Sequence, residues 1–262
     1  MDNLSDMIWI EQRKAIRSRI PLWTMVGSLF MPLGIAFLIF VSKNPEIAQQ
    51  LGLVSAKANL VAYSAADWST YLGLYGQIIA AGGFILFVMN TSWVFGREFT
   101  DGTLKDLLAV PVQRSSILLA KFIVVAAWSA VLTVVIYVVG LIMGAIINLP
   151  GASPGVFLHG TALVAVTACL VVAVVPPFAF FASVGRGYLL PIGVAILALM
   201  MANLIAVLGW GAYFPWGVPG MYASLAIKGT ALEPVSFVLV LLTGAAGVYV
   251  TYLWWKYADQ SK

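Results

Sequence analysis

Six long apolar runs constrain this chain more than any other feature of its sequence. A helix needs about 20 apolar residues to cross the hydrocarbon core of a bilayer, and each run reaches that length. Every backbone polar group in hydrocarbon must be bonded within its own segment, so these runs must be helical. The sequence therefore predicts an all-α integral membrane protein with six transmembrane helices. The runs are Leu22–Val41, Tyr71–Phe95, Ile117–Ile147, Val156–Phe181, Leu189–Leu208 and Val235–Trp255.

The composition supports the same class. Of the 262 residues, 62% are hydrophobic and 9% are charged, whereas a soluble domain carries about 25% charged residues. We therefore expect residues 1–262 to form a single transmembrane domain, with no room for a second, soluble one. The net charge of +4 does not indicate nucleic-acid binding, because membrane proteins retain lysine and arginine on one side of the bilayer.

The basic residues are divided unequally between the two sides that six spans define. If the N-terminus is cytoplasmic, only Lys43, Lys57 and Lys228 fall outside. This bias follows the positive-inside rule and predicts that both termini are cytoplasmic. The basic residues inside are Arg13, Lys14, Arg17, Arg19, Arg97, Lys105, Arg114, Lys121, Arg186, Lys256 and Lys262.

The first 21 residues precede the first run and form an amphipathic pattern. A helix from Leu4 to Ile20 with Trp9 at its edge predicts an interfacial helix, whose basic residues suit anionic lipid headgroups. A signal peptide fits less well, because the following apolar run is long and no small-x-small cleavage site ends it. The expected apolar face consists of Leu4, Ile8, Ala15, Ile16 and Ile20.

Residues 96–115 separate the second and third runs and are predicted to form a cytoplasmic loop. A charged residue at the bilayer centre costs about 2.5–3.5 kcal/mol, so this segment must lie in water or against a partner. Its charged residues, with those just beside it, are Arg97, Glu98, Asp101, Lys105, Asp106, Arg114 and Lys121.

A short helix is predicted inside this loop. Gly102 makes a turn, Thr103 and Asp106 resemble a capping box, and Pro111 ends the helix. A helix this short is unstable alone in water, so its apolar face requires a groove in a protein. The alternative is a loop helix that lies on the bilayer surface. The apolar face consists of Leu104, Leu107 and Leu108.

The residues from Gly96 to Arg114 carry a resemblance. The pattern G-R-E-F-x-D-G-T-L-K-x-L-L-x-x-P-x-x-R resembles the cytoplasmic loop of ABC-2 type exporter permeases, in which this loop contacts a separate ATPase subunit. The resemblance implies that the loop couples the permease to ATP hydrolysis. The residues that carry it are Arg97, Glu98, Asp101, Gly102, Thr103, Leu104, Lys105, Leu107, Leu108, Pro111 and Arg114.

Residues 209–234 connect the last two runs on the predicted outer side. The tract from Gly209 to Gly220, GWGAYFPWGVPG, resembles permeases of bacitracin- and lantibiotic-type exporters. Its aromatic residues suit the headgroup region. A re-entrant element is the alternative, which the resemblance favours, and its backbone must then be buried in protein or line a cavity. The aromatic residues are Trp210, Tyr213, Phe214, Trp216 and Tyr222.

No catalytic, metal or nucleotide site is predicted. The sequence lacks G-x-x-x-x-G-K-[ST], and its single histidine, His159, and single cysteine, Cys169, are too few for a zinc site or a Cys–His pair. We expect His159 to lie near the outer end of the fourth span. No acidic or basic residue is expected deep within a span, which disfavours an ion-driven transporter.

A few polar or small residues do interrupt the spans. Gln77, Asn90 and Asn203 either line a pathway or join helices by hydrogen bonds. Because the second and fifth spans border the cavity in the family that the chain resembles, Gln77 and Asn203 are candidate pathway residues. Gly140 and Gly144 form a GxxxG pair that lets another helix approach closely. The Pro176–Pro177 pair is expected to kink or end the fourth span.

The resemblance implies a permease subunit of an ABC exporter in a prokaryotic plasma membrane. Its partners are two ATPase subunits that carry ATP and Mg²⁺, and a second permease that is another copy or a sister chain. The chain itself would be neither an enzyme nor a cofactor carrier. Its substrate would be an antibiotic, an antimicrobial peptide or another amphipathic compound. Two alternatives remain: a membrane sensor or scaffold that docks a soluble regulator, and a membrane enzyme that acts on lipid-linked substrates.

Overall fold

A computed structural model describes residues 2–44, 46, 67–109, 111–227 and 229–257. Lys57, Lys228 and Lys262, which entered the orientation argument, lie outside this part of the chain. All regular structure within it is helical. The helices are α1 (Asp2–Arg17), α2 (Ile20–Lys43), α5 (Trp68–Ile78), the π-helical η2 (Ile79–Gly83), α6 (Phe84–Thr100), α7 (Leu104–Ala109), α8 (Arg114–Ile146), α9 (Pro154–Val174), α10 (Pro177–Val184), α11 (Leu189–Val207), the short η3 (Gly211–Tyr213), α12 (Val218–Ile227) and α13 (Pro234–Tyr257).

The described residues contain six helical segments that are long and apolar enough to cross a membrane. Each overlaps one predicted run, so the prediction of an all-α membrane protein with six spans is confirmed. The second span is a continuous helix made of α5, η2 and α6, and the fourth consists of α9 and α10. The six segments are Ile20–Lys43, Trp68–Thr100, Arg114–Ile146, Pro154–Val184, Leu189–Val207 and Pro234–Tyr257.

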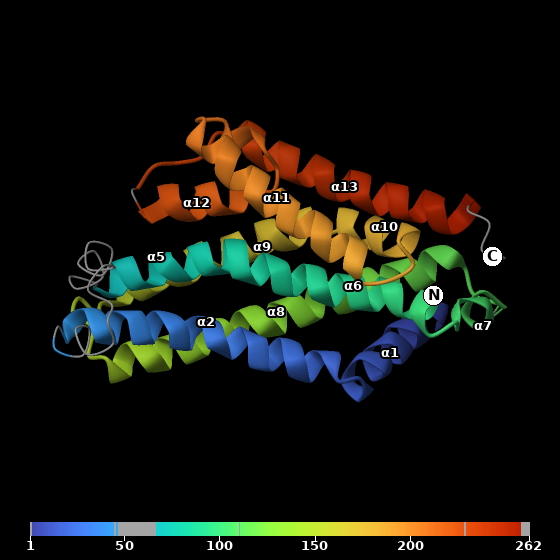
Figure 1. Cartoon of the computed structure of the whole chain (residues 1–262), viewed down its shortest axis with the longest axis horizontal. Coiled ribbons are helices and arrows are strands. Elements are labelled where there is room, and N and C mark those ends of the chain that lie inside the picture. Colours follow the sequence, from blue (N-terminus) through green and yellow to red (C-terminus); the bar gives the residue numbers. More distant parts are fainter. Residues whose placement is uncertain (1, 45, 47–66, 110, 228, 258–262) are drawn as a thin grey trace.

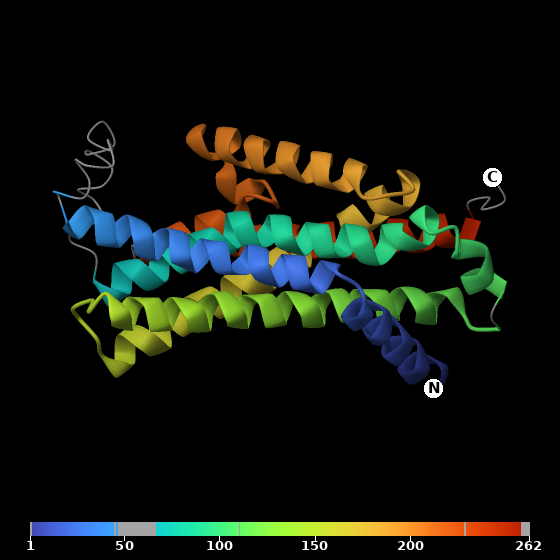
Figure 2. The same cartoon turned by 60° about the horizontal axis from the view of Figure 1, so that its bottom comes forward.

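The spans lie side by side along the long axis of the molecule (Figure 1). α1, α7 and the last turn of α13 gather at one end, which we call the charged end, while α1 diverges from the bundle axis (Figure 2). The opposite end, which we call the far end, holds the end of α2 and the start of α5. Basic residues in the elements of the charged end include Arg13, Lys14, Arg17, Arg97, Arg114, Lys121 and Lys256.

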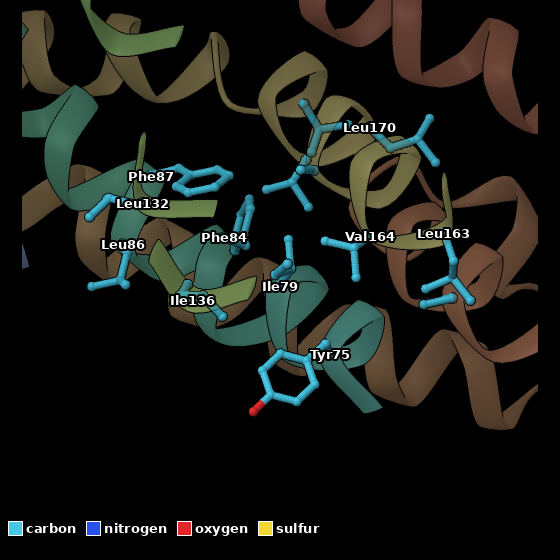
Figure 3. Packing of buried hydrophobic residues seen from close by; sticks show 14 of the residues in the cluster. Tyr75, Ile79, Phe84, Leu86, Phe87, Leu132, Ile136, Leu163, Val164 and Leu170 are labelled. Carbon is cyan, nitrogen blue, oxygen red and sulfur yellow. The ribbon is translucent and has the colours of Figure 1, made fainter. Parts of the chain in front are cut away.

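The second span forms the centre of the bundle. Of its apolar stretch, 61% is buried, against 17% for α11. Its side chains Ile79 and Phe84 face Val164 of α9 in the main core (Figure 3). The Phe84 ring also meets Phe178 of α10 edge-on, with 5.4 Å between the ring centroids. Because only a small part of α11 is buried, most of its surface is free to contact lipid or a partner.

Gly140 and Gly144 let the aromatic side of α5 pack directly on α8. A Cβ atom on Gly144 would lie 2.6 Å from the Trp68 ring, and one on Gly140 would overlap the Tyr75 ring. The Tyr71 hydroxyl donates to the Gly140 carbonyl at 2.9 Å. The GxxxG pair thus serves close packing, as predicted, but against aromatic rings within the same chain.

Two prolines break the fourth span, as the sequence predicts. α9 ends at Val174 and α10 begins at Pro177, because neither Pro176 nor Pro177 has an N–H for the helix ladder. The indole of Trp216 donates to the Val174 carbonyl at 3.1 Å, at the point where α9 ends. Trp216 therefore contacts the break in the fourth span.

The described residues of the 209–234 segment fold back along the bundle. α12 packs against α5 and α9, and its residues Val218 and Ala223 are fully buried. α12 thus packs beside two of the spans, as the protein-buried backbone of a re-entrant element would require; that this segment is re-entrant stays a prediction. Trp210 and Tyr213 are exposed at the turn before it.

The N-terminal helix forms, but its buried face differs from the predicted one. α1 packs on α8 through a stripe of residues spaced four apart, Met7, Glu11 and Ala15. Ile16, expected on the apolar face, is 65% exposed, because it lies about 100° around the helix from Ala15 and outside the stripe that contacts α8. The other predicted face residues, Leu4, Ile8 and Ile20, pack at least partly against the core of the charged end.

We predict that Gly140→Ala lowers the thermal stability of the purified protein. The added methyl group collides with Tyr75 on a packed helix face, and such overpacking costs about 1–3 kcal/mol. Gly193→Ala is the matched control, since a Cβ atom there meets nothing within 4 Å and alanine favours the helix by about 1 kcal/mol. Equal melting temperatures for the two variants in detergent would contradict the packing described for α5 and α8.

Candidate functional site

The loop between the second and third spans contains the predicted glycine turn and the predicted short helix. α6 ends at Thr100, and Gly102 adopts a left-handed φ of +68°, which favours glycine. α7 begins at Leu104, and the Leu107 N–H donates to the Thr103 carbonyl at 3.0 Å. We call residues 101–113 the α7 loop. It lies at the charged end, beyond the ends of α6 and α8 (Figure 1).

The exposed side of the α7 loop is polar, and its apolar side packs against other residues of the chain. Leu104 is only 7% exposed and belongs to the core of the charged end, with Leu107 packed beside it. The chain itself therefore supplies the apolar groove that Leu104 requires. The side chains of Lys105 and Leu108 lie outside the described part. Exposed residues of the loop, among those whose side chains the structure describes, are Asp101, Gly102, Thr103, Asp106, Pro111 and Gln113.

Arg114 joins the start of α8 to the end of α13. Its Nη1 donates to the carbonyls of Trp255 at 2.7 Å and Lys256 at 3.1 Å. The last carbonyls of a helix lack partners within the helix and carry its negative dipole end. The guanidinium therefore satisfies them and fixes α13 to the base of the α7 loop.

Four charged residues from three helices form a buried ion cluster beside this loop, which we define as Glu11 and Lys14 of α1, Glu98 of α6 and Lys121 of α8. The Lys121 ammonium donates to Glu98 at 2.8 Å, to Glu11 at 3.1 Å and to the Val94 carbonyl at 2.8 Å. Lys14 approaches Glu11 at 2.8 Å and Glu98 at 3.3 Å. Lys121 is fully buried, and the two carboxylates are nearly so.

Each charged group of the cluster faces an opposite charge, which offsets the cost of burying it. Burial by itself raises the pKa of the Glu11 carboxyl, but the ammonium groups of Lys121 and Lys14 hold that pKa below its ordinary value. The cluster contains as many carboxylates as ammonium groups, two of each. Such a cluster holds α1, α6 and α8 in one arrangement, because separating any member leaves an unpaired buried charge.

Sequence reasoning missed this cluster. It treated Glu98 and Lys121 as part of a solvated or partner-facing segment and expected no charge deep within a span. One signal was available: Glu11 lies four residues from both Met7 and Ala15, on what becomes the buried stripe of α1. A lone acid on an apolar helix face indicates a buried cation elsewhere in the chain.

Arg97 is also engaged within the chain. It is half-buried, and its guanidinium stacks over the Trp93 ring at 4.7 Å. Arg97 and Glu98 therefore position the charged end from inside, whereas Arg114, Asp101, Thr103 and Asp106 are exposed at its surface.

The two candidate pathway residues meet in one groove between the second span, α11 and α12. It encloses about 290 Å³. Gln77 and Asn203 are both exposed there, and the Asn203 amide donates only to the Leu199 carbonyl of its own helix. We call this the Gln77 groove. Asn90, in contrast, is buried and donates to the Val125 carbonyl of α8. The groove is lined by Gln77, Ala80, Ala81, Leu199, Ala202, Asn203, Ala206, Trp216, Gly217, Gly220, Met221 and Ser224.

The π-helical η2 lies at the wall of this groove. It follows Gln77 by two residues and contributes Ala80 and Ala81 to the lining. A π-helical turn weakens the regular hydrogen-bond ladder and is found at functional positions in helices. The groove thus combines amides, an indole and apolar side chains, a surface suited to an amphipathic molecule.

No metal or catalytic site emerges from the described residues. Among them no three His, Cys, Asp or Glu side chains are grouped to hold a metal ion. His159 is exposed in the first turns of α9, near the far end as predicted, and Cys169 is exposed.

Comparisons with known proteins point to one family. The family model described as ABC-2 family transporter protein matches residues 7–203, which extends from α1 into α11. A bacitracin transport permease protein, BCRB, from Bacillus licheniformis is 28% identical over 182 residues, which are 70% of this chain and 88% of that protein. No solved structure matches the chain.

We predict that Lys121→Met destabilises the protein far more than Lys14→Met. Both lysines contact Glu11 and Glu98, but Lys121 is fully buried and Lys14 is 28% exposed. Removing one member of a buried ion pair costs about 3–5 kcal/mol, whereas water can replace a partly exposed ammonium. Thermal or denaturant unfolding of the purified variants measures the difference, and equal losses would show that Lys121 is not the centre of the cluster.

Proposed function

The chain belongs to the ABC-2 family of transporter proteins, and from this premise we propose that it is the membrane permease of an ATP-driven exporter. The observation that carries the proposal is the family match over residues 7–203 together with a short helix, α7, held at the charged end between two spans. The chain contains no phosphate-binding loop of its own. ATP and Mg²⁺ would therefore bind to a separate ATPase subunit.

The α7 loop is the proposed docking surface for that ATPase. Its exposed face carries Asp101, Thr103 and Asp106, while Leu104 anchors the helix to the core. The predicted bias of basic residues toward this end supports a cytoplasmic α7 loop, with both termini on the same side. In this proposal α1 lies at the membrane interface through Trp9, which is 56% exposed, and Arg13, which stacks on its ring.

Movement of the α7 loop would reach the spans through fixed contacts. The loop continues directly into α6 and α8, the ion cluster joins these helices to α1, and Arg114 joins α8 to α13. ATP-driven closure of two ATPases would shift these four helices together, because their buried contacts favour discrete arrangements over gradual deformation. A complete exporter would contain two ATPases and two permeases, the second permease being another copy or a sister chain.

The Gln77 groove is the proposed substrate surface. It opens beside α11, the least buried of the six spans, where a second permease could complete it. The similar protein from Bacillus licheniformis is named for bacitracin transport, and the groove offers amides within an otherwise apolar wall. We therefore propose an amphipathic antibiotic or antimicrobial peptide as substrate, exported across a prokaryotic plasma membrane.

The docking proposal predicts that Asp106→Arg releases the ATPase. Asp106 is exposed, so reversing its charge leaves the fold intact but opposes a complementary surface on the partner. Copurification of the ATPase with the variant should fall at least tenfold and export with it. Glu233→Arg, an exposed charge reversal just before α13 and outside the α7 loop, is the control. Undiminished copurification with Asp106→Arg would exclude this face of α7 as the docking surface.

The pathway proposal predicts that Gln77→Leu and Asn203→Leu alter substrate stimulation of ATP hydrolysis. Both amides are exposed in the groove, so their loss removes hydrogen bonds to substrate without removing a contact between helices. The concentration of substrate for half-maximal stimulation should rise about tenfold, with basal hydrolysis and melting temperature unchanged.

Asn90→Leu is the control for a structural amide. Asn90 is buried and bonded to α8, so its loss should lower the melting temperature and leave substrate stimulation as in the wild type. A lower melting temperature with unchanged stimulation for Gln77→Leu and Asn203→Leu would assign those amides to packing instead.

A further inference from the structure

A second, almost entirely apolar groove lies between α8 and α13, away from the Gln77 groove. It encloses about 540 Å³, within the range of roughly 300–1,000 Å³ that is usual for small-molecule sites. Its only polar groups are the hydroxyls of one serine and two tyrosines. The groove is lined by Ser115, Leu118, Leu119 and Phe122 of α8 and by Ala245, Val248, Tyr249 and Tyr252 of α13.

The groove lies where two spans reach the charged end. Its residues come from the first turns of α8 and from the last turns of α13. Leu119 is 49% exposed and Tyr249 is 61% exposed, so the groove opens on the surface of the bundle. If the charged end lies at the membrane surface, as in the proposed function, lipid chains just below the headgroups would surround this groove, a depth at which tyrosine is typically found.

Two basic residues, Arg114 and Lys256, lie beside this groove at the charged end. The Lys256 ammonium lies 5.8 Å from the centre of the Tyr252 ring, which lines the groove, and it forms no ion pair with a carboxylate in the described part of the chain. Arg114 precedes Ser115 on the opposite wall and uses one nitrogen, Nη1, for the α13 carbonyls. The remaining guanidinium N–H groups are available for an anion.

We propose that this groove binds one anionic phospholipid. An acyl chain would lie between α8 and α13 against Leu118, Phe122 and Val248, and the lipid phosphate would lie between Lys256 and Arg114. The positive charges of Lys256 and Arg114 determine which lipid binds, because two cations at the headgroup level favour a lipid with net negative charge over a zwitterionic one. The lipid would then bridge the two helices beside the contact between Arg114 and the Trp255 carbonyl.

The test compares lipids on the purified full-length protein. Delipidated protein in detergent is titrated with phosphatidylglycerol, phosphatidylcholine or inorganic phosphate, with melting temperature and native mass spectrometry as readouts. We expect phosphatidylglycerol to raise the melting temperature most and to remain bound as one molecule per chain. Equal effects of the two lipids, or an equal effect of phosphate alone, would overturn the proposal.

Matched variants locate the site. Ala245→Trp fills the groove and should abolish the preference for phosphatidylglycerol, whereas Ala246→Trp, at an exposed neighbour outside the lining, should retain it. Lys256→Gln should weaken phosphatidylglycerol binding about fivefold, the effect of one basic residue at a charged membrane surface. Arg17→Gln, an exposed basic change on α1, should leave binding unchanged.

Two patterns among the variants would contradict a lipid site. If Ala245→Trp and Ala246→Trp bind phosphatidylglycerol alike, the lipid lies elsewhere. If Ala245→Trp changes the oligomeric state and leaves lipid binding intact, the groove is an interface with another protein.

Discussion

The buried contact of Lys121 with Glu11 and Glu98 is the interaction on which the charged end depends. Each of these groups would be costly to bury alone, and together they are nearly inaccessible to water. Because the three belong to α8, α1 and α6, the cluster fixes the position of the N-terminal helix relative to both spans that flank α7. It also gives Glu98 a role inside the chain: it positions the α7 loop and does not itself face a partner.

Other polar contacts extend this fixed region across the same end. Arg114 binds the last carbonyls of α13, and the Trp255 indole donates to the Ser183 hydroxyl of α10 at 3.0 Å. Each contact satisfies a group that a helix end or a buried ring would otherwise leave unpaired. α1, α6, α8, α10 and α13 are thereby joined at the level of the α7 loop, while α11 remains mostly exposed. Such a division suits a transporter in which one surface docks a partner and another faces the substrate.

The second span connects these two regions within one helix. Gln77 of the groove and Glu98 of the ion cluster are separated by about 30 Å along a continuous helix, at 1.5 Å per residue. The π-helical η2 lies between them, directly beside the groove. Displacement at the α7 loop can therefore reach the groove through a single element. The π-helical turn, with Gly82 packed against Met31, is where the backbone hydrogen bonds of that helix can most readily rearrange.

The sequence by itself determined the six spans, the break at Pro176–Pro177, the turn at Gly102 and the start of α7, because these follow from apolar length and local backbone chemistry. It also singled out Gln77 and Asn203 as unusual, since isolated amides in apolar helices require partners. Only the tertiary structure decided which face of α1 is buried, that Leu104 packs inward, and that Trp216 reaches the break after α9. The ion cluster shows the physical reason. Glu11, Glu98 and Lys121 are far apart in sequence, and no local pattern records that three helices bring their charges within about 3 Å.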